Sequence, residues 1–138
     1  METNFFIKNR ERLAAELSEE SLTILFAGEA PPRSADETYD FVPNRNFYYL
    51  TGIDRPNIIL AIKKNGGKTE EMLFIEENDP VMEKWVGRKL SEEEAKATSG
   101  IKTIHKLEKF TQTVHMALQH ENFSSVYLNL ELMSWDSA

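Results

Sequence analysis

A continuous apolar run from Ile58 to Ile62 is the feature that most limits how this chain folds. Its length and branched side chains are typical of a β-strand buried on both faces, as strands in the middle of a sheet are. A Thr51-Gly52 break and a proline turn precede the run, and the segment before the break, Tyr39 to Leu50, is rich in aromatic residues. We therefore expect a central strand with an aromatic segment beside it, at the rim of a site.

A β-hairpin is predicted directly after this strand. The segment Lys64-Asn65-Gly66-Gly67-Lys68 separates the first apolar run from a second one, Glu71 to Ile75. Asn and Gly both tolerate positive φ, so Asn-Gly between two apolar runs is a strong signal for a turn that joins antiparallel strands. The two runs are expected to be neighbours in the sheet.

Helices and further strands are interleaved with this hairpin. Helices are expected from Thr3 or Asn4 onward, from Asp79-Pro80 to Gly87, from Ser91 to Ser99-Gly100, and over Leu107–Gln119. Strands are expected over Leu22–Ala27, Thr103–His105 and Val126–Leu130, and a helical turn is favoured over Asn46–Leu50. Such an order predicts an α/β domain with a mixed sheet of about five strands and flanking helices.

The buried faces of two helices follow from the spacing of apolar residues. In the first helix the inward side chains are expected to be Phe6, Leu13 and Leu17, and the outward ones Lys8, Arg10, Glu11 and Glu16. In the last helix the inward side chains are expected to be Phe110, Val114, Ala117 and Leu118. Both patterns are those of amphipathic helices that cover a sheet.

Composition excludes several classes of protein. The chain has 138 residues, no cysteine and a formal net charge of -7. No apolar run approaches the roughly 20 residues of a membrane span, and the N-terminus lacks the apolar core of a signal peptide. The negative charge disfavours nucleic acid, and the absence of cysteine fits a reducing cytoplasm.

The residue types of a catalytic centre are not arranged in any known pattern here. There is no HExxH, GxSxG or glycine-rich phosphate loop. His115 and His120 are five positions apart, which does not place them on one helical face, and His105 is expected near a strand end. We expect neither metal binding nor catalysis by residues of this segment.

Two segments resemble one known family. They are NRNFYYLTGIDRPNIILAI and LFIEENDPVMEKWVGRKLS. Their aromatic-Leu-Thr-Gly and Trp-Val-Gly-Arg elements, in this order and with the predicted helices and strands around them, resemble the N-terminal, non-catalytic domain of the Xaa-Pro aminopeptidase, prolidase and creatinase family. The resemblance covers nearly all of the chain and implies an RNase-H-like α/β fold.

The same resemblance implies a second domain that these residues do not contain. In the family a larger pita-bread domain follows, and it holds two divalent ions, usually manganese, on aspartates, a histidine and glutamates. The ions would act as Lewis acid and as generator of the hydroxide that hydrolyses an Xaa-Pro bond. None of those ligands can be carried over to this chain, so residues 1–138 are expected to be a single non-catalytic domain that is inactive alone.

Trp85 and Arg88 are candidates for the substrate cleft or for an interface. The rigid ring of Trp85, beside the flexible Gly87, could close over an apolar substrate side chain, and the alternative is a core or interface aromatic. Arg88 could hold a carboxylate or a backbone carbonyl through its fork, and the alternative is a solvated or intrachain-paired arginine.

Three further candidates surround the Thr-Gly break: Asn46, Tyr48 and Arg55. Members of the family often have an aspartate where Asn46 stands, and an amide can still form hydrogen bonds there. Tyr48 and Tyr49 are expected to be one buried and one facing the rim. Arg55 is the weakest of these candidates, and the alternative for it is an ordinary surface charge.

Two functions stay open at this level. The resemblance implies the N-terminal domain of a cytoplasmic, metal-dependent Xaa-Pro aminopeptidase or dipeptidase, in which it shapes the cleft for proline-containing peptides and mediates homo-oligomer contacts. The alternative is a non-catalytic peptide- or protein-binding module of the same fold. The sequence that follows residue 138 would distinguish them.

Overall fold

A computed structural model describes residues 2–28, 43–76, 90–120 and 123–128. Along the chain its elements are α1 (Thr3–Glu16), β1 (Ser21–Phe26), α2 (Arg45–Thr51), β2 (Ile59–Asn65), β3 (Lys68–Ile75), α4 (Glu92–Ser99), β4 (Ile104–Lys106), the short 3₁₀ helix η1 (Leu107–Lys109), α5 (Phe110–His120) and β5 (Ser125–Leu128). These bounds lie close to the predicted ones. The helix predicted from Asp79 to Gly87 lies outside the described residues.

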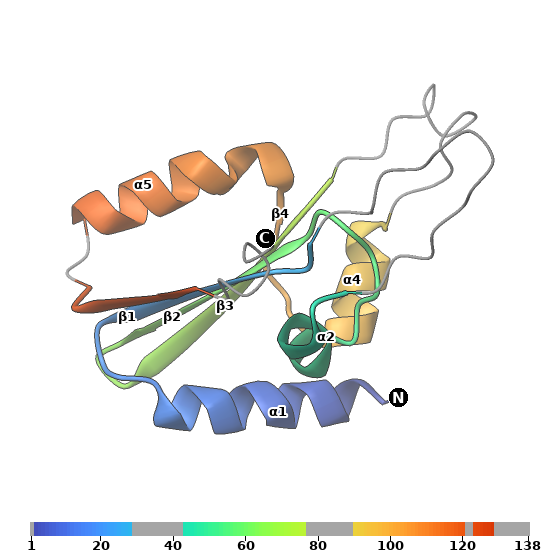
Figure 1. Cartoon of the computed structure of the whole chain (residues 1–138), viewed down its shortest axis with the longest axis horizontal. Coiled ribbons are helices and arrows are strands. Elements are labelled where there is room, and N and C mark those ends of the chain that lie inside the picture. Colours follow the sequence, from blue (N-terminus) through green and yellow to red (C-terminus); the bar gives the residue numbers. More distant parts are fainter. Residues whose placement is uncertain (1, 29–42, 77–89, 121–122, 129–138) are drawn as a thin grey trace, which may run out of the picture.

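The strands form one mixed sheet in the order β4-β3-β2-β1-β5 (Figure 1). β2 is antiparallel to β1 and β3, whereas β5 is parallel to β1 and β4 is parallel to β3. The apolar run chosen from the sequence is therefore the central strand. A five-stranded mixed sheet with flanking helices confirms the predicted fold class.

Both faces of the central strand are buried. Leu60 and Ile62 point to the face covered by α1, α2 and α4, and Ile59 and Ala61 point to the face covered by α5 (Figure 1). Leu60 and Ile62 have no exposed surface at all (both 0%). Burying a side chain of this size contributes about 2 kcal/mol, so this short run stabilises both layers of the domain.

The hairpin between β2 and β3 forms as predicted, with one difference in its turn. Asn65 pairs with Lys68, so the two central turn residues are Gly66 and Gly67. Both have positive φ, 62° and 78°. This conformation matches the twist of antiparallel strands, and glycine adopts it without steric cost.

Arg10 is buried, and its assignment to the solvent face of the first helix was wrong. Only 1% of Arg10 is exposed, and its Nη1 donates a hydrogen bond of 2.7 Å to the carbonyl oxygen of Leu50. Its Nε lies 3.0 Å from Glu71 Oε2, without the alignment of a hydrogen bond, so that contact is electrostatic. Arg10 lies four residues after Phe6 and three before Leu13, so it shares a helix face with these apolar residues. Its position on that face, and not its charge, determines that it is buried.

Side chains from other elements satisfy the carbonyl groups at the end of α1. Lys64 Nζ donates to the carbonyl oxygens of Ala14 (2.7 Å) and Leu17 (2.9 Å).

The N-terminus of α1 differs from the prediction. Glu2 occupies the N-cap position and no side chain caps the helix, so the predicted cap by Thr3 or Asn4 is not present. The Thr3 hydroxyl instead donates to the carbonyl of Ala97 (2.5 Å), which ties α1 to the last turn of α4.

Helices α2 and α4 end in the same way. Each has a hydroxyl residue, a glycine and an isoleucine in sequence, Thr51-Gly52-Ile53 and Ser99-Gly100-Ile101. In each, the buried hydroxyl donates to the carbonyl four residues earlier and accepts from the isoleucine amide two residues later, at 2.7 to 3.1 Å. The glycines are in the left-handed conformation, with φ of 74° and 81°. At both helix ends a hydroxyl group thus donates to a carbonyl oxygen of the last turn, and a left-handed glycine ends the helix.

The last helix covers the sheet with fewer residues than predicted. Phe110 and Val114 pack against the core and Ala117 is buried, as expected. Leu118, predicted to face inward, is 49% exposed. It lies eight residues after Phe110, which places it about 80° around the helix from that residue, at the edge of the inward stripe.

Candidate functional site

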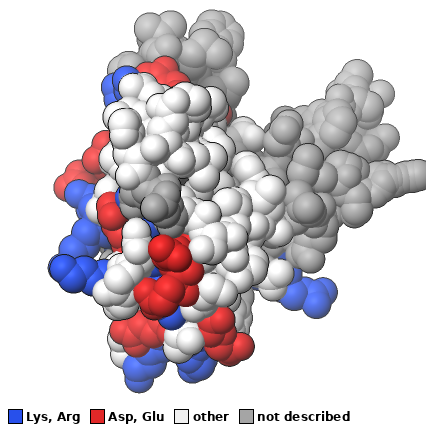
Figure 2. Space-filling model, turned by 90° about the vertical axis from the view of Figure 1, so that its left-hand side faces the viewer, with Lys and Arg blue, Asp and Glu red and all other residues white. Residues whose placement is uncertain are grey.

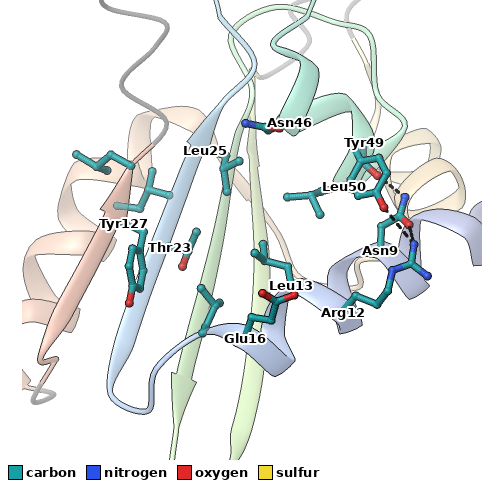
Figure 3. Close-up of a pocket in the computed structure, with 13 residues that line it drawn as sticks. Asn9, Arg12, Leu13, Glu16, Thr23, Leu25, Asn46, Tyr49, Leu50 and Tyr127 are labelled. Atoms are coloured by element: carbon teal, nitrogen blue, oxygen red, sulfur yellow. Dashed lines mark hydrogen bonds between the residues drawn. The ribbon is translucent and has the colours of Figure 1, made fainter.

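A hollow of about 620 Å³ lies on the α1 face of the sheet, beside its β5 edge (Figure 3). We call it the edge hollow. Side chains from α1, α2, β1 and β5 surround it: Asn9, Arg12, Leu13, Glu16, Leu17, Thr23, Ile24, Leu25, Asn46, Tyr49, Leu50, Tyr127 and Leu128. It exists because α1 and α2 cover the middle of this face and leave β1 and β5 partly open.

The wall of the edge hollow on the helix side is built by polar side chains of α1. Asn9 is buried, and its Nδ2 donates 2.7 Å to the carbonyl oxygen of Tyr49. Arg12 Nη2 donates to Asn9 Oδ1 and, at 3.1 Å, to the Tyr49 hydroxyl. These bonds bring positive charge and donors to the C-terminal end of α2, where helix carbonyls favour them, and they fix the position of Tyr49.

Of the predicted site residues that the structure describes, only Asn46 lines the edge hollow. It lies in the first turn of α2, which the Asn44 side chain caps by accepting from the Phe47 amide at 3.1 Å. Figure 3 shows Asn46 above Leu25 and Leu50, and Asn46 is exposed. Its amide can donate and accept hydrogen bonds, which suits a polar rim over an apolar floor.

Tyr48 and Arg55 do not line the edge hollow. Tyr48 is 38% exposed and its ring meets Phe6 edge to face at 5.9 Å. Arg55 is half-buried in the loop that precedes β2. Asn46, Tyr48 and Arg55 are therefore not brought together in one cluster. Trp85 and Arg88 lie outside the described residues.

The expectation that one of the two tyrosines is buried was wrong. Tyr48 and Tyr49 are both exposed, at 38% and 45%. The buried residues of α2 are Phe47, Leu50 and Thr51. Because the helix presents these three positions to the sheet, the tyrosines between them face outward. Tyr49 does lie at the hollow, so one tyrosine occupies a rim as predicted.

The sheet contributes Thr23, Leu25 and Tyr127 to the floor. Thr23 and Tyr127 are paired across β1 and β5 and so lie on the same face. The Tyr127 hydroxyl lies 3.1 Å from Ser18 Oγ. Hydrogen bonds from Ser18, and to a smaller extent from Ser125, lower the pKa of Tyr127 below its ordinary value.

Asn9, Arg12 and Tyr127 were not recognised from the sequence. Asn9 carried a signal, because it lies three residues after Phe6 and four before Leu13 on the helix, which places a polar side chain close to the buried stripe. Tyr127 carried a weaker one, since an alternating strand places every second side chain on one face. Arg12 had none.

The edge hollow offers binding contacts of two kinds. Leucine and isoleucine side chains give it apolar surface, and its other lining residues carry hydroxyl, amide, guanidinium and carboxylate groups. Among the described residues, no three His, Cys, Asp or Glu side chains are grouped as metal ligands are. His105 stacks on Phe74 at 5.3 Å, and His115 and His120 are exposed on α5.

The distribution of charge can be followed on one face of the molecule. Figure 2 shows acidic and basic side chains interspersed on one side of the molecule, around a broad uncharged area. A wide basic surface of the kind that binds nucleic acid is not seen on this face. No helix in the described ranges has the length and apolar character that crossing a membrane requires.

Comparison with known proteins places the chain in a family. A model of the aminopeptidase P N-terminal domain matches residues 6–127. The chain belongs to the aminopeptidase P N-terminal domain family. This result confirms the resemblance found in the sequence, and the confirmed fold class is the fold that this resemblance implied.

Similar proteins of this family are considerably longer. The Xaa-Pro aminopeptidase of Haemophilus influenzae is 29% identical over 130 residues, which are 94% of this chain and 30% of that protein. The structure of a putative aminopeptidase P from Bacillus anthracis superposes with a TM-score of 0.91 at 54% identity, covering 100% of this chain and 33% of that one. The chain spans about a third of the length of these relatives.

A third comparison concerns the fold alone. The structure of Escherichia coli aminopeptidase P with the inhibitor Pro-Leu matches with a TM-score of 0.83 at 24% identity, over 100% of this chain and 30% of that one. The same arrangement of strands and helices is therefore present in that aminopeptidase P.

Proposed function

We propose that this chain is the non-catalytic N-terminal domain of a metal-dependent Xaa-Pro aminopeptidase, and that it shapes the active-site cleft and mediates contacts between subunits. The match of the family model to residues 6–127 is the observation that carries the proposal. We prefer aminopeptidase to dipeptidase because the relatives from Haemophilus influenzae and Escherichia coli are named Xaa-Pro aminopeptidases. Acting on proline-containing peptides in the cytoplasm is part of the same proposal.

The proposal assigns the chemistry to polypeptide outside this chain. The described residues contain no grouped set of metal ligands, so no step of a metal reaction is attributed to them. Two divalent ions, which we propose to be manganese, would supply the Lewis acid and the attacking hydroxide in the domain that follows. The contribution of the present domain is recognition, because proline lacks an N–H and must be selected by shape.

Within this domain we propose Asn46, Trp85 and Arg88 as the residues nearest the cleft. Asn46 is exposed at the start of a capped helix, on a rigid support. The Asn44 cap fixes the backbone of this first turn, and a side chain that orients a substrate or a neighbouring subunit requires such a support.

The activity is tested by comparing the full-length protein with residues 1–138. With manganese and a peptide that carries proline in the second position, the full-length protein should release the first residue, and a chelator should abolish the release. Residues 1–138 should show no turnover under the same conditions. Metal-dependent turnover by the pure fragment would overturn the assignment of the chemistry to another domain.

The contribution of this domain is tested by substitutions in the full-length protein. Asn46→Ala and Trp85→Ala should each lower kcat/KM, by about tenfold if they orient the substrate, without changing thermal stability. Arg45→Ala is the matched control, because Arg45 is exposed on the same helix and does not line the edge hollow. Unchanged kinetics in the first two variants would refute the cleft assignment.

The alternative of a peptide- or protein-binding module is favoured by the mixed apolar and polar lining of the edge hollow. It predicts that the full-length protein binds proline-containing peptides, measured by calorimetry, yet releases no product with any divalent ion. Turnover would exclude it.

A further inference from the structure

We propose that Asn65 is a site of spontaneous covalent modification, at which the chain loses ammonia and the asparagine becomes aspartate or isoaspartate. Asn65 is the last residue of β2, and Gly66 and Gly67 follow it in the hairpin turn. In this reaction the backbone nitrogen of Gly66 attacks Cγ of Asn65. The modification is a property of the chain itself and does not depend on whether the longer protein is a peptidase.

The atoms of the reaction balance with water as the co-reactant. The Gly66 nitrogen forms a bond to Cγ of Asn65, and the side-chain nitrogen takes up the proton of the Gly66 amide and leaves as ammonia. The product is a five-membered succinimide ring. Water then opens the ring at one of its two carbonyl carbons. One product is aspartate, and the other is isoaspartate, in which the main chain runs through Cγ. No electrons are transferred.

The residue that follows Asn65 distinguishes it from the other asparagines. Asparagine is a thermolabile residue in general, but Asn65 is the only one in this chain that precedes a glycine. Glycine has no Cβ to crowd its nitrogen during the attack. Phenylalanine or isoleucine follows Asn4, Asn46 and Asn57. The attack is therefore least hindered at Asn65.

The surroundings of Asn65 leave room for the reaction. Asn65, Gly66 and Gly67 are all exposed, so water can reach the ring. A Cβ atom added to either glycine would meet no atom within 4 Å. The pair of Asn65 with Lys68 is the last one of the β2–β3 ladder, so the Gly66 nitrogen lies beyond the ladder. Neither packing nor strand pairing shields the two reacting groups.

A contact from Glu19 opposes the reaction. The main chain at Asn65 has to rotate away from the extended conformation of a paired strand before the nitrogen can reach Cγ, so the turn must open first. The Glu19 carboxylate accepts a hydrogen bond of 2.7 Å from the Gly67 amide and holds the turn against the segment that follows α1. The side chain of Glu19 is 51% exposed. Exposed hydrogen bonds at the end of a hairpin open readily, so this contact slows the reaction without preventing it.

Isoaspartate at position 65 would disturb more than the turn. It adds one carbon to the main chain, so the pair with Lys68 loses its register, whereas aspartate keeps the normal main chain. The preceding residue, Lys64, donates to the carbonyl oxygens of Ala14 and Leu17 at the end of α1. A displaced strand end thus weakens the contact between the sheet and α1, and the isoaspartyl protein is less stable.

Ageing the full-length protein at mildly alkaline pH tests the proposal. Mass spectrometry of peptides from successive samples detects the exchange of an amide NH₂ for OH at each asparagine. We expect conversion at Asn65 to be at least about tenfold faster than at the exposed Asn4 or at Asn57, a difference of about 1.4 kcal/mol in the barrier. Equal rates at the three positions would overturn the proposal.

Two glycine variants of the same turn form a matched pair. Gly66 and Gly67 have φ of 62° and 78° and open space around them, but only Gly66→Ala places a Cβ beside the attacking nitrogen. We expect Gly66→Ala to slow the conversion of Asn65 at least about tenfold, and Gly67→Ala not to slow it. An unchanged rate in Gly66→Ala, or equal slowing in both variants, would overturn the proposed reaction.

Two further variants test the control by Glu19 and the effect on stability. Glu19→Ala removes the acceptor of the Gly67 amide, so conversion of Asn65 should be about two- to fivefold faster, and an unchanged rate would refute that control. The isolated isoaspartyl protein should melt at a lower temperature than Asn65→Asp, which has the same charge and a main chain of normal length. Equal melting temperatures would refute the coupling to α1.

Discussion

A Cβ atom on Gly52 would stand 2.4 Å from Cε2 of Phe6. On Gly100 it would stand 2.6 Å from Cδ1 of Ile7. Two successive residues of α1 are thus in contact with the two glycines that end α2 and α4, and both glycines have φ near 80°. The N-terminal helix sets the distance of the other two helices on its side of the sheet.

Alanine at either glycine should therefore be strongly destabilising. Gly52→Ala and Gly100→Ala add left-handed strain to a clash with a packed side chain, and we expect each to lower the free energy of unfolding by about 2 to 4 kcal/mol. Gly66→Ala is the control, with a φ of 62° and open space around the new methyl group, and should cost about 1 kcal/mol. Urea unfolding measures all three, and equal losses would contradict the role of α1.

The buried hydroxyls at the same helix ends should matter as acceptors. Thr51→Val leaves the Ile53 amide without the 3.1 Å bond that it makes to Thr51 Oγ1, and we expect a loss of about 1 to 3 kcal/mol. Thr51→Ser keeps the hydroxyl and should cost less. If both variants lose the same stability in urea unfolding, the methyl group and not the hydrogen bond is important.

The buried Arg10 should contribute more than the exposed Arg12. Arg10→Met removes the bond to the Leu50 carbonyl and leaves Glu71 without its close cation. We expect a loss near the lower end of the range for a broken buried pair, about 3 kcal/mol, because Glu71 keeps some solvent contact. Arg12→Met is the control and should cost under 1 kcal/mol. Calorimetric melting curves of the two variants check the difference.

The Tyr127 hydroxyl should titrate early. Hydrogen bonds from Ser18 and Ser125 lower its pKa below 10.0 in the folded chain, and unfolding removes them. The folded state then loses this proton first, so the contribution of Tyr127 to stability is present above pH 10 and is lost as the pH falls through the folded-state pKa. In Ser18→Ala the pKa of Tyr127 should rise toward 10.0, seen as a later increase in tyrosinate absorbance. Because the chain has four tyrosines, the variant Tyr127→Phe is measured as well, and its difference from the parent protein gives the absorbance change that belongs to Tyr127.

Local signals were sufficient for much of the fold. The central strand could be predicted because five adjacent apolar residues are compatible with few other structures. The helix α4 was predicted from Ser91 and Glu94, and both bonds of that capping box are present, at 3.1 and 3.0 Å. These features depend on residues a few positions apart, which the sequence displays directly.

Features that depend on distant residues were harder to predict. The burial of Arg10 requires a carbonyl 40 positions away and a carboxylate on β3, and neither is visible in the pattern of α1. The edge hollow is formed by four elements from both ends of the chain. Asn46 was singled out by resemblance, whereas its neighbours Asn9 and Tyr127 became apparent only when the elements were assembled.

The position of β1 between β2 and β5 has a consequence for synthesis. Ser124 donates its amide to the Glu20 carbonyl at the start of the β1–β5 pairing, and these residues are 104 positions apart. A ribosome therefore completes α1, the hairpin and α4 while one edge of β1 still lacks its partner. Pairing at such long range is slow, and an open apolar strand can associate with other chains in the meantime. The nascent domain is expected to need a chaperone most during that interval.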